Sequence, residues 1–343
     1  MKSYIFKQEG YLKGYSDGHI DEKYTNVLFI AGVHGNELGT IRLAYQLIEE
    51  FEDYGEGHYK GIGLIGVIPC VNQSGMRNNT RDVSENYADL NRGWDDDPRS
   101  DLLEEIGRME KEYGIKFHII VDMHCSPNIA PVFLLNRDQM YINQIVHTVE
   151  SFNKEAVEYL EPIHCCVRDT RITTFKRTFS NKERIVLTYE QSGYEKSNPR
   201  YNASISHYIT DAFLETIVPQ LRDVINVGSK VPDDCIDNHF DCKYLCQHII
   251  CNTEGILRLP TAYGKNGAYD LGYEISNGDI IAEVLDVETN ELIEEIKWYY
   301  KPNKNFPDED NARIVELETE CHYERYVTPG TIIAMIQPII PIE

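Results

Sequence analysis

The chain has 343 residues, of which 42% are hydrophobic and 26% are charged, and its formal net charge is −23. This length allows two domains, each with its own core, and the composition is typical of a soluble globular protein. The acidity argues against nucleic acids and anionic membranes as partners, because both require clustered Lys and Arg. No apolar run approaches the roughly 18 residues of a membrane helix, and the N-terminal segment becomes polar too early for a signal peptide, so we expect a cytoplasmic protein.

Short apolar runs alternate with helical patterns over the first two-thirds of the chain, which predicts an α/β fold with a mostly parallel sheet flanked by helices. The expected strands are residues 26–33, 62–69, 117–123, 131–135 and 185–190. The expected helices lie near residues 37–51, 98–113, 138–160 and 203–226. After about residue 230 the pattern changes to short β-rich runs with turn signals. We therefore expect a catalytic α/β domain over residues 1–230 and a small β-rich domain over residues 231–343.

A histidine and a glutamate follow the first of these buried strands, in the sequence His34-Gly35-Asn36-Glu37. At a strand end both side chains can face one point, and they supply a nitrogen and a carboxylate to a zinc ion. The same spacing occurs at His19/Glu22 and at His147/Glu150. Only His34 and Glu37 stand at the end of a strand, where α/β proteins place their ligands.

The strand over residues 117–123 runs directly into His124, which is a candidate third ligand. A close pair of ligands with a distant third leaves one position for water, as in catalytic zinc sites. Taken alone, His124 would be interpreted more simply as a hydrogen-bonded histidine at the edge of the core. Its position at a second strand end, like that of His34, favours the ligand interpretation. His118 has the same strand parity but lies deeper, so we expect it to be a core residue.

A long polar segment over residues 72–94 follows another strand and carries three arginines, Arg77, Arg81 and Arg92. Such a loop commonly serves binding. The planar guanidinium of Arg92 suits a substrate carboxylate, and Arg81 could stabilise an oxyanion. The alternative is that these arginines only neutralise neighbouring Asp and Glu side chains.

The strand over residues 185–190 ends in a carboxylate, Glu190, before a turn. At a third strand end, Glu190 would be placed to accept a proton from a zinc-activated water. Without the zinc ligands it would be an ordinary solvent-facing residue.

The nine cysteines are an odd number without the spacing of a disulfide scaffold, which favours reduced thiols. The adjacent pair Cys165 and Cys166 is interpreted as two small buried side chains.

These segments, in this order, resemble the zinc carboxypeptidase superfamily, and within it the succinylglutamate desuccinylase/aspartoacylase branch. The resemblance is carried by His-Gly-Asn-Glu at 34–37, Asp-Leu-Asn-Arg at 89–92, Asp-Met-His at 122–124 and the strand-terminal Glu190. It covers roughly residues 25–195. The β-rich tail is similar to the C-terminal domain that this branch often carries.

The resemblance implies a role for each matching residue. It assigns one Zn²⁺ ion to His34, Glu37 and His124, and the general base to Glu190. It implies that Arg81 stabilises the oxyanion and that Asn91 and Arg92 bind the substrate carboxylate. It also implies that Asp89 orients a zinc-bound histidine.

The sequence departs from the branch at three places. The run from Arg81 to Asp89 is somewhat longer than usual, so Arg77 competes with Arg81 for the oxyanion. Residues 191–194, after the base, differ from the usual Gly-containing ending. A further substrate arginine often precedes the base, and Arg168, Arg171, Arg177 and Arg184 all qualify.

The sequence therefore predicts a zinc-dependent hydrolase that cleaves the amide bond of an N-acyl amino acid, a small molecule with a free carboxylate. A zinc carboxypeptidase acting on short peptides or peptidoglycan stems is the alternative with the same chemistry. A non-catalytic zinc-binding protein is a third interpretation, against which Glu190 and Arg81 argue, since binding alone requires neither. The acyl group, the oligomeric state and the use of another divalent metal stay open.

Overall fold

The structure is a computed structural model. It describes residues 11–14, 24–53, 59–83, 89–91, 101–126, 132–136, 139–156, 163–168, 181–192, 205–206, 208–228, 230, 247–258, 274–299, 311–317 and 325–338. The chain forms two compact units. The first holds residues 1–126, 133–165 and 170–240, and the second holds residues 127–132, 166–169 and 241–343. The expected domain boundary at residue 230 adjoins residues 231–246, which lie outside the described residues.

A seven-stranded sheet has the strand order β1-β3-β2-β4-β7-β5-β6. In that order the strands are Tyr11–Gly14, Ile62–Ile68, Thr25–Ala31, Ile119–Ser126, Ile185–Ser192, Val132–Asn136 and His164–Arg168. β2 pairs in parallel with β3 and β4, and β4 pairs in parallel with β7, whereas β1 runs antiparallel to β3. The carboxyl ends of β3, β2, β4 and β7 therefore meet at one edge of the sheet.

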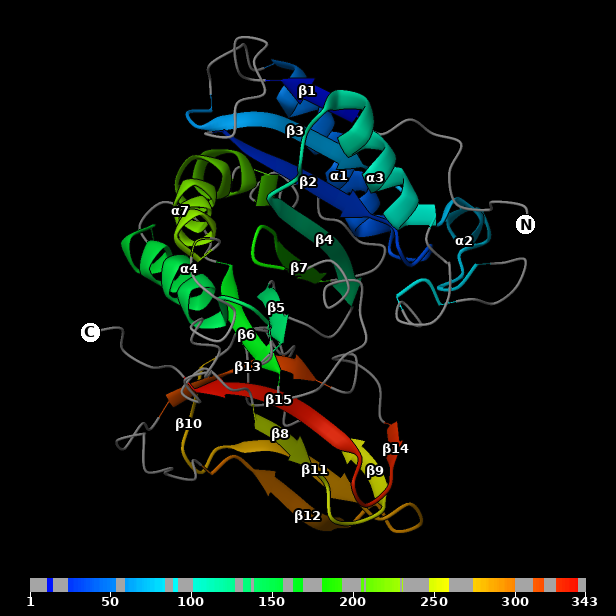
Figure 1. Cartoon of the computed structure of the whole chain (residues 1–343). Coiled ribbons are helices and arrows are strands. Elements are labelled where there is room, and N and C mark those ends of the chain that lie inside the picture. The colour runs from blue at the N-terminus through cyan, green and yellow to red at the C-terminus, as the bar shows by residue number, and fades with distance from the viewer. Residues whose placement is uncertain are drawn as a thin grey trace. The chain divides into compact units, whose positions relative to one another are not determined.

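Helices cover both faces of this sheet (Figure 1). They are α1 (Leu38–Asp53), α2 (Gln73–Asn78), α3 (Asp101–Tyr113), α4 (Ile142–Ala156), the π-helix η1 (Tyr208–Ile217) and α7 (Val218–Gly228). Leu28 and Ile30 of β2 share an apolar cluster with Ile106 of α3. The ring of Phe29, which points to the opposite face, lies 6.0 Å from Phe51 of α1 and 6.4 Å from Phe213 of η1. Alternating β2 side chains thus divide the core into two layers.

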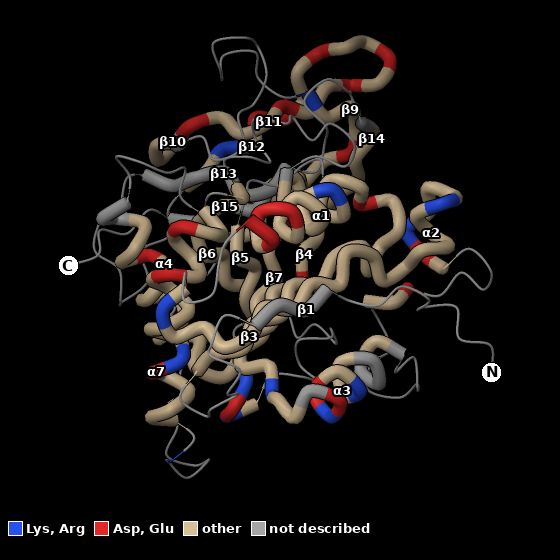
Figure 2. The backbone as a smooth tube through the Cα atoms, turned by 90° about the horizontal axis from the view of Figure 1, so that it is seen from above, with Lys and Arg blue, Asp and Glu red and all other residues tan. Residues whose placement is uncertain are grey.

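The central strands carry almost no charge. β2 and β3 have no charged residue, and β4 and β7 have one each, Asp122 and Glu190. Figure 2 shows these strands mostly in tan, with the coloured Lys, Arg, Asp and Glu residues prominent on the helices. A carboxylate on such a strand needs a specific partner, because burying an unpaired charge is costly.

The second unit contains two four-stranded sheets, with orders β10-β13-β15-β8 and β12-β11-β9-β14. The strands are β8 (Gln247–Ile250), β9 (Gly255–Arg258), β10 (Glu274–Ser276), β11 (Ile280–Leu285), β12 (Leu292–Lys297), β13 (Asn311–Leu317), β14 (Arg325–Val327) and β15 (Ile332–Pro338). Ile333 of one sheet shares an apolar cluster with Leu257 and Val284 of the other. The turn glycines Gly278 and Gly330 both have positive φ, 93° and 88°.

The expected fold class is confirmed: a mostly parallel sheet flanked by helices precedes β-rich sheets. All five expected strands and all four expected helices form, with shifted ends. The polar segment after β3, which was interpreted as a loop, contains the short helix α2. β1 and β6 were not expected. Within the described part of the chain, no helix is long and apolar enough to cross a membrane.

The cysteines differ in part from the expectation of reduced thiols. Cys70, Cys125, Cys165 and Cys251 are buried and are not in a disulfide bond. Cys166 is buried as expected but is disulfide-bonded. Adjacent residues on a strand point to opposite faces, so Cys165 and Cys166 have different surroundings.

Candidate metal centre

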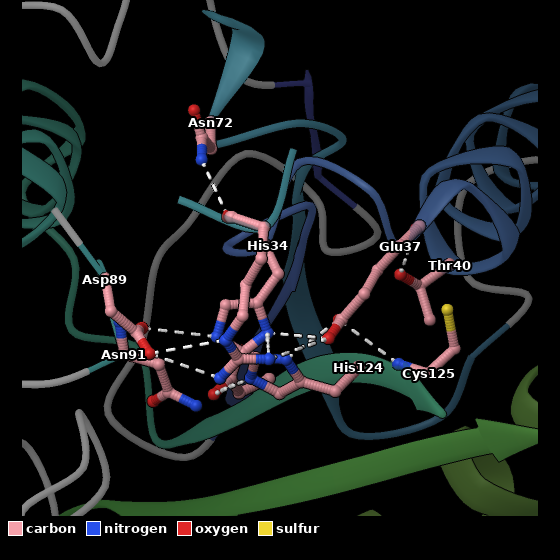
Figure 3. Close-up of polar contacts among 10 residues, drawn as sticks. His34, Glu37, Thr40, Asn72, Asp89, Asn91, His124 and Cys125 are labelled. Carbon is pink, nitrogen blue, oxygen red and sulfur yellow. Dashed lines mark hydrogen bonds and ion pairs between the residues drawn. The ribbon is translucent and has the colours of Figure 1, made fainter. Parts of the chain in front are cut away.

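Two histidines and a glutamate meet at the carboxyl ends of β2 and β4. Nδ1 of His34 lies 2.6 Å from Oε1 of Glu37, and Nδ1 of His124 lies 2.9 Å from Oε2 of the same carboxylate (Figure 3). The three candidate ligand atoms lie within 4.8 Å of one another, and each residue is only 2–3% exposed. Among the residues that the structure describes, this is the one such group with metal-ligand spacing.

The backbone between β2 and α1 places His34 and Glu37 on one side of a tight turn. Gly32 has φ 64°, in the left-handed region that glycine adopts without strain. Gly35 lies so close to α2 that an added Cβ would come within 2.2 Å of the carbonyl carbon of Gly75. The backbone N–H of Glu37 donates to the carbonyl oxygen of His34 at 3.2 Å. The turn closes in this form because glycine stands at the point of close approach.

Each histidine has an aspartate on its far nitrogen. Nε2 of His34 lies 3.3 Å from Oδ1 of Asp89, and Nε2 of His124 lies 3.0 Å from Oδ2 of Asp122. Asp89 therefore has the contact that the resemblance implied. The contact of Asp122 was not anticipated, although residues i and i+2 of a strand share a face and the Asp-x-His spacing could have indicated it.

This arrangement tests whether the site fits a metal ion. When Nε2 carries the ring proton, beside Asp122 in His124 and facing Asp89 in His34, each Nδ1 presents a lone pair to the carboxylate of Glu37. Nitrogen and oxygen lone pairs at 2.6 and 2.9 Å attract each other only through a shared cation, either a proton or a metal ion. Two imidazole nitrogens and a carboxylate oxygen form a donor set that suits Zn²⁺. The residues present thus fit a metal ion.

The electrostatics keep the carboxylates of Glu37 and Asp89 ionised. Burial alone would raise the pKa of Glu37, but His124 and His34 lower it from 4.5 to about 2. Burial would also raise the pKa of Asp89, yet hydrogen bonds from His34 and the Asn91 backbone, with the charge of Arg81, hold it well below its usual range. Burial would lower the pKa of His124, but Asp122 and Glu37 raise it well above 6.5. The centre thus attracts positive charge.

Arg81, rather than Arg77, lies beside this centre. Its Nε and a terminal nitrogen donate to Oδ2 of Asp89 at 3.3 and 3.2 Å. Its other terminal nitrogen lies 3.3 Å from Nδ1 of His34. The side chain is 41% exposed, so it can also meet a ligand from solvent. Arg77 is exposed in the last turn of α2.

Glu190 lies on the strand next to His124. β4 and β7 pair with His124 opposite Glu190, which places both side chains on one face of the sheet, and Glu190 is half-buried. The backbone N–H of Asn91 donates to Oδ1 of Asp89 at 2.8 Å, so Asn91 adjoins the centre. The predicted carboxylate-binding residue Arg92 lies outside the described residues.

The four candidate substrate arginines differ in where they lie relative to the centre and in whether the structure describes them. Arg184 precedes β7 and donates to the Phe117 carbonyl oxygen at 2.9 Å and to Glu110 at 2.5 Å. It stands six residues before Glu190 on an extended strand, about 20 Å away, so it does not reach the centre. Arg168 ends the edge strand β6, and its side chain is not described. Arg171 and Arg177 lie outside the described residues.

The remaining histidines with similar spacing are not part of the centre. His118 is buried and accepts a hydrogen bond from the backbone N–H of Asn26 at 3.0 Å, as expected for a core residue. Glu150 contacts His164 at 2.8 Å, whereas His147 points to solvent. His19 and Glu22 lie outside the described residues.

The fold and the centre define a mixed α/β protein with a His–Glu–His cluster at the carboxyl ends of its parallel strands. Residues 23–192 match the model of the succinylglutamate desuccinylase/aspartoacylase catalytic domain. Residues 23–192 therefore form a catalytic domain of this family, as the motifs predicted. No curated protein matches the sequence.

Solved structures support the fold along nearly the whole chain. An aspartoacylase family protein from Mesorhizobium loti has 13% identity and a TM-score of 0.58, with 97% of this chain and 89% of that chain covered. The product-bound ectoine utilization protein EutE (DoeB) from Ruegeria pomeroyi has 14% identity and a TM-score of 0.54, with 95% and 87% covered. The succinylglutamate desuccinylase/aspartoacylase from Rhodobacter sphaeroides has 16% identity and a TM-score of 0.53, with 93% and 87% covered.

Proposed function

We propose that the chain is a zinc-dependent hydrolase that cleaves the amide bond of an N-acyl amino acid. The observation that carries the proposal is the convergence of His34, Glu37 and His124, with an aspartate behind each histidine. His34 and His124 would bind one zinc ion through Nδ1, and Glu37 through its carboxylate. When bound, such an ion lowers the pKa of a water molecule and polarises a carbonyl oxygen.

Glu190 acts as the general base in this proposal. It is half-buried beside His124, at the edge of the sheet where a substrate amide would meet the ligands. Its carboxylate accepts a proton from the attacking water and then gives that proton to the leaving amine. Because Glu190 is not one of the three clustered ligands, its loss should stop turnover without releasing the metal.

Arg81 stabilises the oxyanion in this proposal. Asp89 holds its guanidinium against the edge of His34, so its direction is set before a substrate arrives. A positioned cation stabilises the negative charge that develops on the amide oxygen. Asn91, which adjoins Asp89, and Arg92 bind the free carboxylate of the substrate.

The substrate class rests on the family and on the carboxylate-binding residues. The named relatives include desuccinylases, aspartoacylases and an ectoine utilization protein, all of which suggest small acylated substrates. An arginine that binds a carboxylate in two places makes a free carboxylate a requirement for binding. Esterification of that carboxylate should therefore abolish turnover.

The test is amine release from N-acyl amino acids with varied acyl groups and, separately, from short peptides with free C-termini. Zinc-loaded wild type should release amine from the first set, and Glu190→Gln should not while retaining its zinc. Glu183→Gln is the matched control, since Glu183 is exposed at the opposite end of the β7 region, and it should match wild type. Turnover of peptides alone would identify a carboxypeptidase instead. Turnover of neither set by the zinc-loaded protein would contradict a catalytic function.

A further inference from the structure

Four polar side chains lie next to one another on one face of β4 and β7, beside the candidate metal centre. Asp122 and His124 share this face of β4, and Thr188 and Glu190 share it on β7. The strands pair with Asp122 opposite Thr188 and His124 opposite Glu190. Thr188 therefore lies two residues before the proposed base Glu190 on β7, and it is the residue paired with Asp122, which contacts His124.

Asp122 is buried with only half of its hydrogen-bonding capacity in use. It is 1% exposed, and its Oδ2 contacts Nε2 of His124 at 3.0 Å. Its Oδ1 is buried and has no hydrogen-bond partner among the residues that the structure describes. A carboxylate oxygen left in this way is costly, because it has lost water without gaining a donor.

Of the described strand residues around Asp122 on this face of the sheet, one can supply the missing donor. The neighbours are Ile30 on β2, Ile120 and His124 on β4, and Val186, Thr188 and Glu190 on β7. Ile30, Ile120 and Val186 belong to the apolar cluster beneath α3. His124 already uses its Nε2, and an ionised Glu190 has no proton to donate. Thr188 is the one neighbour with a hydroxyl group.

The hydroxyl of Thr188 is unsatisfied in the same way. Thr188 is 3% exposed, and its Oγ1 is buried with no hydrogen-bond partner in the described part of the chain. Two residues that pair between β4 and β7 thus carry a buried donor, Oγ1 of Thr188, and a buried acceptor, Oδ1 of Asp122. A rotation about the Cα–Cβ bond directs the hydroxyl without any movement of the backbone.

We propose that Thr188 is a positioning residue for the metal centre, and that it donates a hydrogen bond from Oγ1 to Oδ1 of Asp122. With both oxygens held, the carboxylate keeps its orientation toward Nε2 of His124. That contact in turn fixes the tautomer and the ring orientation in which Nδ1 faces Glu37. The inference rests on the proposed metal function, and it adds Thr188 to the groups that determine the affinity for the metal.

The test is the zinc affinity of the metal-stripped full-length protein, measured by competition with a chromophoric chelator. Thr188→Val keeps the shape of the side chain and removes the hydroxyl, and zinc affinity should fall about tenfold or more, as for other residues behind metal ligands. Thr188→Ser restores the hydroxyl and should bind zinc within about threefold of wild type. Thr188→Ala removes the same hydroxyl with less crowding and serves if the valine variant does not fold.

Thr210→Val is the matched control. Thr210 is fully buried in η1, and its hydroxyl donates to the Ser206 carbonyl oxygen at 3.1 Å, outside the metal centre. This variant should bind zinc as wild type does, which separates a role in positioning from a general loss of packing. Equal zinc affinity of Thr188→Val, Thr188→Ala and wild type would overturn the role of Thr188 alone. A wild type that binds no zinc would overturn the metal centre, and this inference with it.

Discussion

At the scale of single residues, the two candidate histidine ligands have similar acidic neighbours on both ring nitrogens. Each turns Nδ1 toward Glu37 and Nε2 toward an aspartate, Asp89 for His34 and Asp122 for His124. An aspartate on the far nitrogen fixes the tautomer and makes the near nitrogen a stronger donor to a metal. The centre therefore consists of two His–Asp pairs around one carboxylate.

Replacing Arg81 with alanine should lower kcat by roughly 10²–10³-fold, which is the usual loss when one donor to an oxyanion is removed. The metal content should not change, because Arg81 is not among the clustered ligands. Arg77→Ala is the matched control, since Arg77 is exposed on α2, and it should keep wild-type kcat. A loss of kcat in Arg77→Ala but not in Arg81→Ala would reverse the assignment of the two arginines.

The sequence indicated candidate residues of the centre where they stand at the ends of apolar strands. His34, Glu37, His124 and Glu190 each follow or end an apolar run, and parallel strands bring such ends together. The sequence could not choose between Arg77 and Arg81, because that choice depends on how residues 72–83 fold. Asp122 was missed as a contact of His124, because its partner depends on the orientation of the histidine ring.

At the scale of elements, the short helix α2 packs against the turn between β2 and α1, which carries His34 and Glu37. It has six residues, too few to show a helical period, and its capping residues define its ends. Oδ1 of Asn72 accepts from the backbone N–H of Gly75 at 2.8 Å, and Asn79 closes the helix with φ 51°. The side-chain nitrogen of Asn72 and the backbone N–H of Gly35 both donate to the carbonyl oxygen of Arg81. These contacts join distant segments, so the sequence pattern did not reveal the helix.

Replacing Gly35 with alanine should damage both stability and metal binding. The added Cβ would meet the backbone of Gly75 at 2.2 Å, and backbone cannot move aside as a flexible side chain does. We expect a loss of about 1–3 kcal/mol in unfolding free energy, measured by urea denaturation, and a weaker zinc affinity.

The matched control for this substitution is Gly107→Ala in α3. Gly107 is exposed within a helix, and its added Cβ would meet nothing within 4 Å. Because glycine disfavours a helix interior, this variant should gain about 0.5–1 kcal/mol and bind zinc as wild type does. Full stability and full zinc affinity in Gly35→Ala would contradict the close approach of the two glycines.

At the scale of the whole molecule, the alternation of strands and helices predicted the layers but not the order of the strands. β1 pairs antiparallel with β3 at one edge, and β6 forms the other edge. Both strands are short, and edge pairing depends on long-range contacts rather than on local pattern. The same holds for the disulfide bond of Cys166, which the count of cysteines did not predict.

The opposite end of the sheet from the metal centre contains a buried neutral histidine. Nδ1 of His118 accepts a hydrogen bond from Asn26, so the ring is neutral. Burial, with the charges of Arg222, Lys116 and Arg184, lowers the pKa of His118 from 6.5 to about 3. The unfolded chain therefore takes up a proton before the folded chain does, and stability that is present above pH 6.5 is lost as the pH falls toward 3.

Replacing His118 with asparagine should remove this pH dependence while keeping an acceptor for Asn26. Between pH 6.5 and pH 5, wild type should lose about 1.6 kcal/mol more stability than the variant. The loss approaches about 1.36 kcal/mol per pH unit only below pH 6.5, because the unfolded histidine is half protonated at pH 6.5. Urea denaturation of both proteins at the two pH values gives the difference. An equal loss in both would contradict a neutral His118 in the folded protein.

The central claim is that His34, Glu37 and His124 hold a metal ion that the reaction requires. Its most direct test is the initial rate of amine release from an N-acyl amino acid by metal-stripped protein to which zinc is added in steps. We predict that the stripped protein is inactive, and that the rate rises in proportion to added zinc and stops rising at one zinc ion per chain. A stripped protein that retains full activity would contradict the claim.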